Sequence, residues 1–239
     1  YVGAFPGGGK TTAVTNWIWH WVRVKKLRVL YLPLEADIDE VYARFACFMA
    51  GVSPDDALSF RLRDAERAGD LQAAIKRAEL KLAQKYLMAD AEFARLLQVD
   101  PIETLTPNAL ARALETTREL ESDIVVVDHV DHTEADANDW SPEIQVSNKV
   151  QHMALRAAKS LGVPFLLTTQ FNSSRSGNDP LVRMKPPSPD WMFNKAKKEM
   201  IGAGIIGLHR VIDPRADQNL LRRVRNREAD AWKVALPNI

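Results

Sequence analysis

Short apolar runs recur along the chain and are separated by longer segments that favour helices. Runs that are almost wholly apolar are typical of strands buried on both faces of a parallel sheet. The predicted strands of this kind are residues 28–34, 124–128 and 163–169. The predicted helices cover residues 12–25, 37–50, 68–96, 106–120 and 143–161.

This alternation of strands and helices predicts an α/β fold with a doubly wound sheet, which binds its ligands at the carboxyl ends of the strands. Residues 205–208, 220–224 and 232–236 predict late strands that are partly antiparallel. The chain has 239 residues, of which 46% are hydrophobic and 26% are charged, as is ordinary for a globular protein. Its length suffices for one large domain with a core.

Net charge and cysteine usage limit the possible partners and the cellular compartment. The formal net charge is +1, so binding to nucleic acid must come from local patches. Cys47 is the one cysteine, which excludes an internal disulfide and suits a reducing, intracellular compartment. We expect it to be a small buried hydrophobe. There is no apolar stretch of transmembrane length and no signal peptide, so we expect no membrane partner.

A glycine-rich segment precedes the first predicted helix. Residues 4–12 are Ala-Phe-Pro-Gly-Gly-Gly-Lys-Thr-Thr, which fits the phosphate-loop pattern Gly/Ala-x-x-x-x-Gly-Lys-Ser/Thr. The glycines let backbone N–H groups point at phosphate oxygens, and the helix that follows directs its positive end at the same anion. Lys10 supplies charge for the β- and γ-phosphates, and the Thr11 hydroxyl is placed to bind Mg²⁺. The predicted nucleotide-binding residues are Pro6, Gly7, Gly8, Gly9, Lys10, Thr11 and Thr12.

Two aspects of the loop remain open. Its first position is Ala4, where glycine is commoner and where alanine requires a negative φ. The alternative interpretation is a glycine-rich turn that binds nothing. In this fold class a whole strand precedes the loop, and Tyr1-Val2-Gly3 is too little for one. We therefore expect the first strand to be missing and the chain to be the ATPase part of a longer protein.

Polar side chains follow the predicted buried strands. Asp128 ends the strand 124–128, where a P-loop NTPase needs an acid for the Mg²⁺ shell. Glu35 follows the strand after the loop helix, where a carboxylate can orient and deprotonate the attacking water. Gln170 ends a third strand, where its amide can sense the γ-phosphate. Each residue has an alternative interpretation. Asp128 could begin a turn, Glu35 could be an acid near a helix start, and Gln170 could be a glutamine of a surface loop.

Other polar residues raise further hypotheses. Arg223 and Arg225 alternate on a late strand, so both guanidinium groups share one face and fit an arginine-finger role across a subunit boundary. The alternative is a solvated basic edge strand. His129, Asp131 and His132 include a His-x-x-His pair, but no cysteine or further histidine cluster completes a zinc site.

The ordered set of motifs resembles the RecA-like ATPase domain of DnaB-type hexameric replicative helicases. The resemblance covers nearly the whole chain. It is carried by residues 4–11, Leu34-Glu35, Arg44 with the following Gly51-Val52-Ser53, 124–128, Val163-Pro164, Thr169-Gln170-x-Asn172, Leu208-His209-Arg210 and Arg223-x-Arg225-Asn226.

This resemblance implies a single P-loop NTPase domain of RecA-like type over residues 1–239, with a central, mostly parallel β-sheet flanked by helices. It implies ATP and Mg²⁺ as ligands. The implied roles are Mg–ATP binding for Lys10, Thr11 and Asp128, a catalytic carboxylate for Glu35, a γ-phosphate sensor for Gln170, and contact with the neighbouring subunit's ATP for Arg223 and Arg225.

The resemblance also implies partners: a homo-oligomer, namely a hexamer, single-stranded DNA, and a primase or loader in a bacterial or phage-infected cytoplasm. The DNA loops correspond to residues 132–144 and 172–189. Arg175, Arg183 and Lys185 are spaced cations among Ser, Asn, Gly and Pro, a pattern that can follow phosphates. The alternative is a surface loop with incidental charges.

Departures from the family favour a divergent member of phage or plasmid type. Arg223 stands where the family has lysine, and His129-Val-Asp-His132 stands where it has Tyr-Leu-Gln-Leu. Two functions remain: an ATP-driven DNA helicase motor, or a RecA-like ATPase that drives assembly or remodelling, as a recombinase-like filament or a clock-type ring, without unwinding. A module that only binds nucleotide is disfavoured, since it needs no carboxylate such as Glu35.

Overall fold

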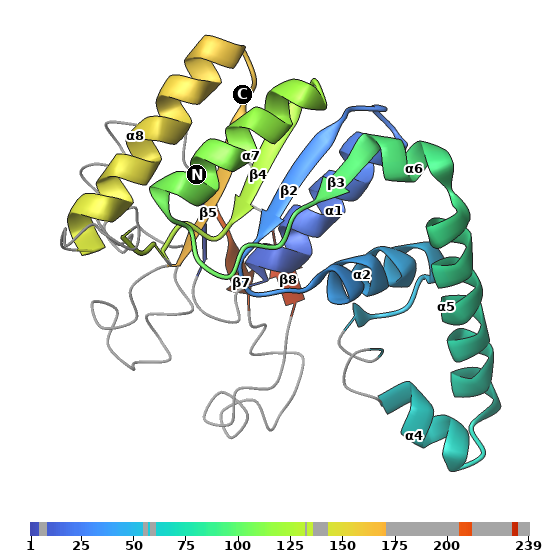
Figure 1. Ribbon diagram of the computed structural model, residues 1–239. Helices are drawn as coiled ribbons and strands as arrows, with labels where there is room; N and C mark the ends of the chain where they lie inside the picture. The colour runs from blue at the N-terminus through green and yellow to red at the C-terminus, as the bar shows by residue number, and fades with distance from the viewer. Residues whose placement is uncertain are drawn as a thin grey trace.

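Figure 1 shows the computed structural model of the chain. The structure describes residues 1–4, 9–54, 57, 61–131, 133–135, 143–170, 206–211 and 231–233, and every structural statement below concerns these residues.

A six-stranded sheet forms the centre of the molecule, with the strand order β3-β2-β4-β5-β1-β6. Every neighbouring pair in it is parallel, which confirms the predicted α/β class. A separate antiparallel pair joins β7 to β8. The strands are β1 Val2–Ala4, β2 Val29–Pro33, β3 Leu97–Val99, β4 Ile124–Asp128, β5 Phe165–Gln170, β6 Ile206–Gly207, β7 His209–Val211 and β8 Ala231–Lys233.

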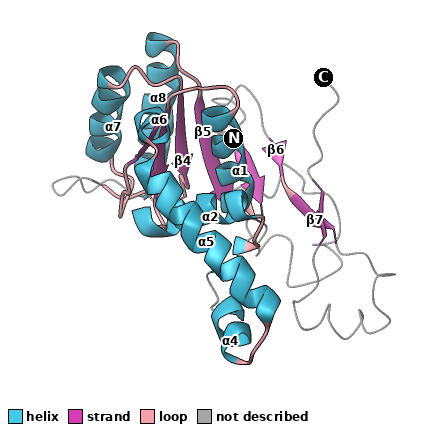
Figure 2. Cartoon of the chain, turned by 90° about the vertical axis from the view of Figure 1, so that its right-hand side faces the viewer, coloured by secondary structure: helices cyan, strands magenta, loops and turns pink. Residues whose placement is uncertain are grey.

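Helices cover both faces of the sheet (Figures 1 and 2). One layer contains α7 and α8, while α1 covers the opposite face and α2 and α6 pack beside it. The helices are α1 Lys10–Arg23, α2 Ile38–Ala50, α4 Arg61–Arg67, α5 Leu71–Ala89, α6 Ala91–Leu96, α7 Pro107–Glu119 and α8 Glu143–Leu161. No helix in the described part of the chain has the length and apolar character needed to cross a bilayer.

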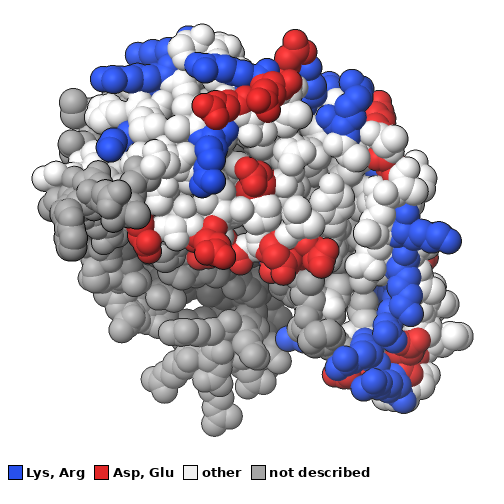
Figure 3. Space-filling model, viewed as in Figure 1, with Lys and Arg blue, Asp and Glu red and all other residues white. Residues whose placement is uncertain are grey.

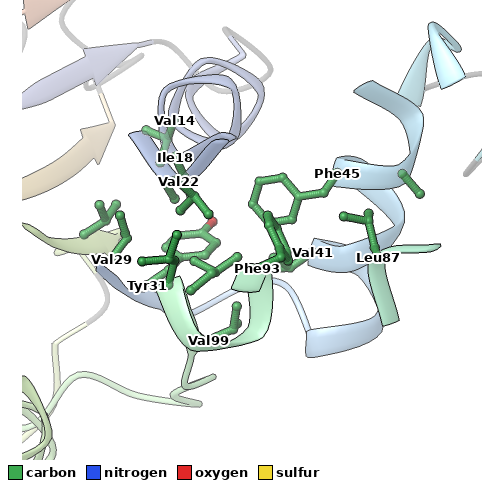
Figure 4. Packing of buried hydrophobic residues seen from close by; sticks show 14 of the residues in the cluster. Val14, Ile18, Val22, Val29, Tyr31, Val41, Phe45, Leu87, Phe93 and Val99 are labelled. Carbon is green, nitrogen blue, oxygen red and sulfur yellow. The ribbon is translucent and has the colours of Figure 1, made fainter. Parts of the chain in front are cut away.

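Alternation along β2 divides the core between the two layers. Val29 and Tyr31 point into a cluster with α1, α2, α5 and α6, whereas Leu30 and Leu32 point into a second cluster with α7 and α8. Figure 4 shows the first cluster, in which Phe45 and Phe93 meet edge to face with ring centroids 5.6 Å apart. Burial on both faces explains why the strands are apolar without interruption.

Side-chain caps set several helix starts. The carboxylate of Asp37 accepts the N–H of Glu40, and the hydroxyl of Thr106 accepts the N–H of Ala109, which confirms both predicted starts. The helix α2 ends at Ala50 and is capped by Gly51, whose φ of 62° is in the left-handed region that favours glycine.

The expected helix over residues 68–96 is interrupted. Asp90 has extended backbone angles, and its carboxylate accepts the N–H of Phe93, so α5 ends and α6 begins there. The short elements α4 and β3 were not expected, because neither is long enough to show a hydrophobic period. The expected strand at 220–224 lies outside the described residues.

The expectation about the first strand is wrong. Val2–Ala4 form β1, which pairs with β5 on one side and β6 on the other. Three residues suffice because parallel neighbours on both sides satisfy their backbone groups and all three are buried. Ala4 avoids the positive φ that alanine tolerates poorly.

An ion pair joins the end of α1 to the junction of α5 and α6. The Arg23 guanidinium donates to the Asp90 carboxylate at 2.5 Å and also lies 4.8 Å from the centre of the Phe93 ring. The hydrogen bond from the N–H of Phe93 and then the hydrogen bond from Arg23 lower the pKa of Asp90, and the charge of Arg23 lowers it further. This carboxylate therefore stabilises the fold above the pKa of an unfolded aspartate, and that contribution is lost as pH falls through its lower folded pKa.

We expect Asp90→Ala to lower the free energy of unfolding at pH 7 by about 1–2 kcal/mol, because it removes a helix cap. Urea unfolding should show the difference from wild type shrinking below about pH 4, where aspartate in the unfolded chain becomes protonated. A difference that is the same at pH 3 and pH 7 contradicts the charge contribution.

Asp70→Ala is the matched control. Asp70 caps α5 by accepting the N–H groups of Gln72 and Ala73, and in the described part of the chain it has no arginine partner. Its replacement should destabilise less than the replacement of Asp90. Equal destabilisation at pH 7 means that the Arg23 pair contributes nothing.

Candidate functional site

The carboxyl ends of β2, β4, β5 and β1 are neighbours along one edge of the sheet. In the register of the sheet, Pro33 pairs with Asp128 and Ala4 pairs with Gln170. Beyond β4, the N–H of Val130 donates to the carbonyl of Thr168 at 3.0 Å, so the chain after Asp128 continues beside β5. The predicted site residues at these strand ends are therefore brought together.

The start of α1 is suited to an anion. Gly9 precedes the helix with a φ of 76°, a left-handed conformation that requires glycine in practice. No side chain among the described residues caps α1, and its first turn contains no acid, whereas carboxylates or a hydroxyl cap α2, α5, α6 and α7. The first helical residue is Lys10, which is buried, followed by Thr11 and Thr12. Backbone N–H groups, dipole and lysine thus favour negative charge here.

Asp128 lies buried at the end of β4 and is held by two hydroxyl groups. Thr168 of β5 donates to one carboxylate oxygen, and Tyr31 of β2 donates to the other at 3.3 Å. Burial, and then the charge of Asp128, raise the pKa of Tyr31, so its hydroxyl remains a donor. Each carboxylate oxygen retains a second lone pair, which leaves capacity for a magnesium-bound water or the ion itself.

His129 joins two of the predicted site residues. Its Nε2 lies 3.0 Å from Oε1 of Glu35 and 3.3 Å from the side-chain amide nitrogen of Gln170. Its Nδ1 accepts the N–H of Asp131 at 3.3 Å. The imidazole is 2% exposed, whereas the Glu35 side chain is 58% exposed. A buried ring therefore anchors an accessible carboxylate.

Asp131 fastens the turn after β4 to the end of β5. One carboxylate oxygen accepts the hydroxyl of Thr169 at 2.8 Å, and the other accepts the backbone N–H of Gln170. The turn that contains His129 is thus fixed to the strand that carries Gln170. Within the described residues no group of three or more His, Cys, Asp or Glu is arranged to hold a metal ion, and His132 lies outside them.

The sequence identified Glu35, Asp128 and Gln170 from the strand ends, and the structure brings them to one edge. The sequence did not indicate the contact of His129 with Glu35 and Gln170, because only the pairing of β2, β4 and β5 brings these positions together. The remaining predicted site residues lie outside the described part of the chain: Pro6, Gly7, Gly8, Arg175, Arg183, Lys185, Arg223 and Arg225.

The loops at this edge are acidic. Figure 3 shows acidic side chains along the lower border of the described surface and basic side chains over α4 and α5. The exposed acids that follow β2, β3 and β4 are Glu35, Asp37, Asp39, Asp100, Glu103 and Glu134. An anionic ligand at this edge therefore depends on Lys10, on α1 and on a cation that it brings with it.

Comparison with solved structures finds the same fold in known ATPase structures. The chain matches one solved ATPase domain with a TM-score of 0.65 and 18% identity, over 87% of this chain and 68% of that one. It also matches a DnaB-like replicative helicase whose structure was reported together with its interactions with primase. That match has a TM-score of 0.66 and 15% identity, over 93% of this chain but 48% of the helicase. The chain thus spans about half the length of that helicase.

A KaiC-like protein, PH0186 from Pyrococcus horikoshii OT3, matches with a TM-score of 0.54 and 14% identity, over 90% of this chain and 72% of that one. No protein-family model and no curated protein matches the sequence. At these identities the likeness shows the fold. The chain has the RecA-like fold of P-loop ATPases, as the resemblance of its motifs predicted.

If Asp128 holds Mg²⁺, Thr168→Val should raise the Mg²⁺ concentration for half-maximal nucleotide hydrolysis by about 10-fold, because removing a hydrogen bond to a metal-binding carboxylate weakens metal affinity by roughly that factor. A Mg²⁺ titration at saturating nucleotide measures it.

Thr117→Val is the matched control. Thr117 is also a buried threonine, but its hydroxyl donates to the carbonyl of Ala113 within α7. This variant should leave the Mg²⁺ requirement unchanged. An unchanged requirement in Thr168→Val shows that Thr168 does not orient Asp128 for a metal.

Proposed function

We propose that this chain hydrolyses ATP at the carboxyl edge of its sheet. The observation that carries the proposal is the pairing of Ala4 with Gln170, which sets the start of the phosphate loop beside the end of β5. Two features support it: the start of α1 at Lys10, which no side chain of the described residues caps, and the buried Asp128. They supply what a magnesium–nucleotide requires.

Each residue has a defined task in this proposal. Lys10 and the N–H groups at the start of α1 bind the phosphates, while Thr11 and Asp128 would hold Mg²⁺. The chemistry it would supply is positive charge that offsets the negative charge of the phosphate oxygens. Glu35 takes a proton from the water that attacks the γ-phosphorus as the bond to the β-phosphate oxygen breaks and ADP leaves. Gln170 binds the γ-phosphate and registers its departure.

The finer proposal is an ATP-driven motor on single-stranded DNA that works as a homohexamer. Its supports are the fold shared with a solved ATPase domain and a replicative helicase, and the motifs that resemble DnaB-type helicases. Arg223 and Arg225 would act on the ATP of the neighbouring subunit, and Arg175, Arg183 and Lys185 would contact DNA phosphates. A primase or loader is the further partner that the resemblance implies.

Glu35→Gln should keep ATP binding and lower turnover by about 10²- to 10⁴-fold, because an amide cannot accept the proton of water. Lys10→Ala should lose ATP binding itself. Equilibrium binding of a fluorescent ATP analogue and steady-state phosphate release separate the two effects.

Glu103→Gln is the control, since it removes an exposed carboxylate from the neighbouring loop after β3. It should behave as wild type in both assays. Weaker ATP binding by Glu35→Gln, with unchanged turnover per bound ATP, excludes Glu35 as the base.

A forked duplex with a single-stranded tail tests the motor. We expect ATP-dependent strand displacement by wild type and weaker single-stranded DNA binding by the Arg183→Ala/Lys185→Ala variant, whatever the base sequence. The slope of log affinity against log salt should fall by about one unit for each phosphate that the variant no longer binds.

Lys81→Ala/Lys85→Ala removes the same charge from α5 and is the control; its affinity and slope should match wild type. Unchanged affinity and slope in the Arg183/Lys185 variant remove that segment from the DNA path. If the protein hydrolyses ATP but displaces no strand under any condition tested, the helicase function is contradicted. The alternative, an ATPase that drives assembly or remodelling, then remains.

A further inference from the structure

His129 is a polar side chain at the site to which the proposed mechanism gives no task. It follows Asp128 directly and is 2% exposed. Its Nε2 is within reach of both Glu35, at 3.0 Å, and the side chain of Gln170, at 3.3 Å. These are the proposed base, which follows β2, and the proposed γ-phosphate sensor, which ends β5. One ring nitrogen thus touches both.

The partners of the ring define where its proton lies. The backbone N–H of Asp131 donates to Nδ1, so Nδ1 is an acceptor and a neutral imidazole carries its proton on Nε2. Nε2 therefore donates to the Glu35 carboxylate. In the structure the Gln170 amide faces Nε2 with its nitrogen, at 3.3 Å. A half-turn of the amide group exchanges the positions of its oxygen and nitrogen and turns the oxygen toward Nε2. In that orientation a single N–H serves two acceptors.

We propose that His129 is a positioning residue that aims Glu35 and couples it to Gln170 through this shared N–H. The proposal rests on the ATPase function proposed above. When Gln170 turns its amide to the γ-phosphate, the N–H passes wholly to Glu35 and fixes its carboxylate against the attacking water. When the phosphate has left, Gln170 returns and shares the N–H again. The proton stays on His129 throughout.

The difference in burial explains why such an anchor matters. The Glu35 side chain is 58% exposed, so without a fixed partner it would lose conformational freedom on adopting the one rotamer that serves catalysis. The imidazole is already immobile, because it is buried and its Nδ1 is tied to the turn that Asp131 fastens to β5. Positioning by a preorganised donor affects turnover more than substrate binding.

The two ring nitrogens allow a sharp test. His129→Gln retains a donor near the position of Nε2 but loses the acceptor for Asp131, whereas His129→Asn retains an acceptor near Nδ1 but loses the donor to Glu35. If the Nε2–H aims Glu35, His129→Asn lowers kcat for ATP by roughly 10- to 100-fold, with KM within about twofold. His129→Gln then stays within about threefold of the wild-type kcat.

Opposite results overturn the proposal. The proposal is wrong if His129→Asn keeps the wild-type kcat, or if His129→Asn is more active than His129→Gln. The ring would then only stabilise the turn after β4 through Nδ1. Equal losses of kcat in both variants, with equal losses of melting temperature, likewise indicate a packing role. His152→Asn, on the exposed side of α8, is the matched control and should leave kcat unchanged.

Coupling to the sensor is tested by combining His129→Asn with Gln170→Ala. Because the two side chains share one N–H, their effects on kcat should depart from the product of the single effects by at least about threefold. Independent effects contradict the sharing. Failure of the ATPase proposal would give a different result. In that case the wild-type protein would not hydrolyse ATP, and the Lys10→Ala variant would bind ATP as the wild type does.

Discussion

Parallel pairing of strands that are distant in the sequence determines where the chemistry of this protein can take place. Because β2, β4, β5 and β1 run in the same direction, their carboxyl ends lie at one edge. There β4 ends at Asp128, β5 ends at Gln170, and Glu35 follows two residues after the end of β2. The Asp128 carboxylate fixes three of these ends together, since it accepts hydroxyl groups from β2 and β5 while it belongs to β4. Asp131 adds a second attachment between β4 and β5. A buried carboxylate needs such partners, so the same contacts hold the edge rigid and leave lone pairs for a ligand.

This edge is acidic in its exposed loops but accepts an anion at one point. The start of α1 provides N–H groups, a positive helix end and the buried Lys10, while the neighbouring strand ends provide carboxylates. An ATP molecule with its Mg²⁺ has matching charges, because the phosphates are negative and the ion that the carboxylates would hold is positive. The proposed function depends on this match rather than on net charge, which is close to zero.

Residues whose role follows from local pattern were predictable from the sequence. The glycine before Lys10, the strand that ends at Asp128 and the caps at Asp37 and Thr106 each have a signal within a few residues of themselves. The role of His129 has none, since a histidine after a strand looks the same whether it begins a turn or contacts a residue 94 positions away. The strand β1 was missed because its three residues gain their stability from β5 and β6, which lie far along the chain. The break at Asp90 was missed because α5 and α6 have compatible apolar spacing on either side of it.

The central claim is that a magnesium–nucleotide binds where these strand ends meet. A crystal structure of the protein with Mg²⁺ and a non-hydrolysable ATP analogue tests it most directly. We predict the γ-phosphate within hydrogen-bond distance of Lys10 and of the Gln170 amide, and Mg²⁺ between Thr11 and Asp128 with Glu35 facing the γ-phosphorus. A nucleotide bound elsewhere, or bound with Asp128 and Lys10 both out of reach, would contradict it.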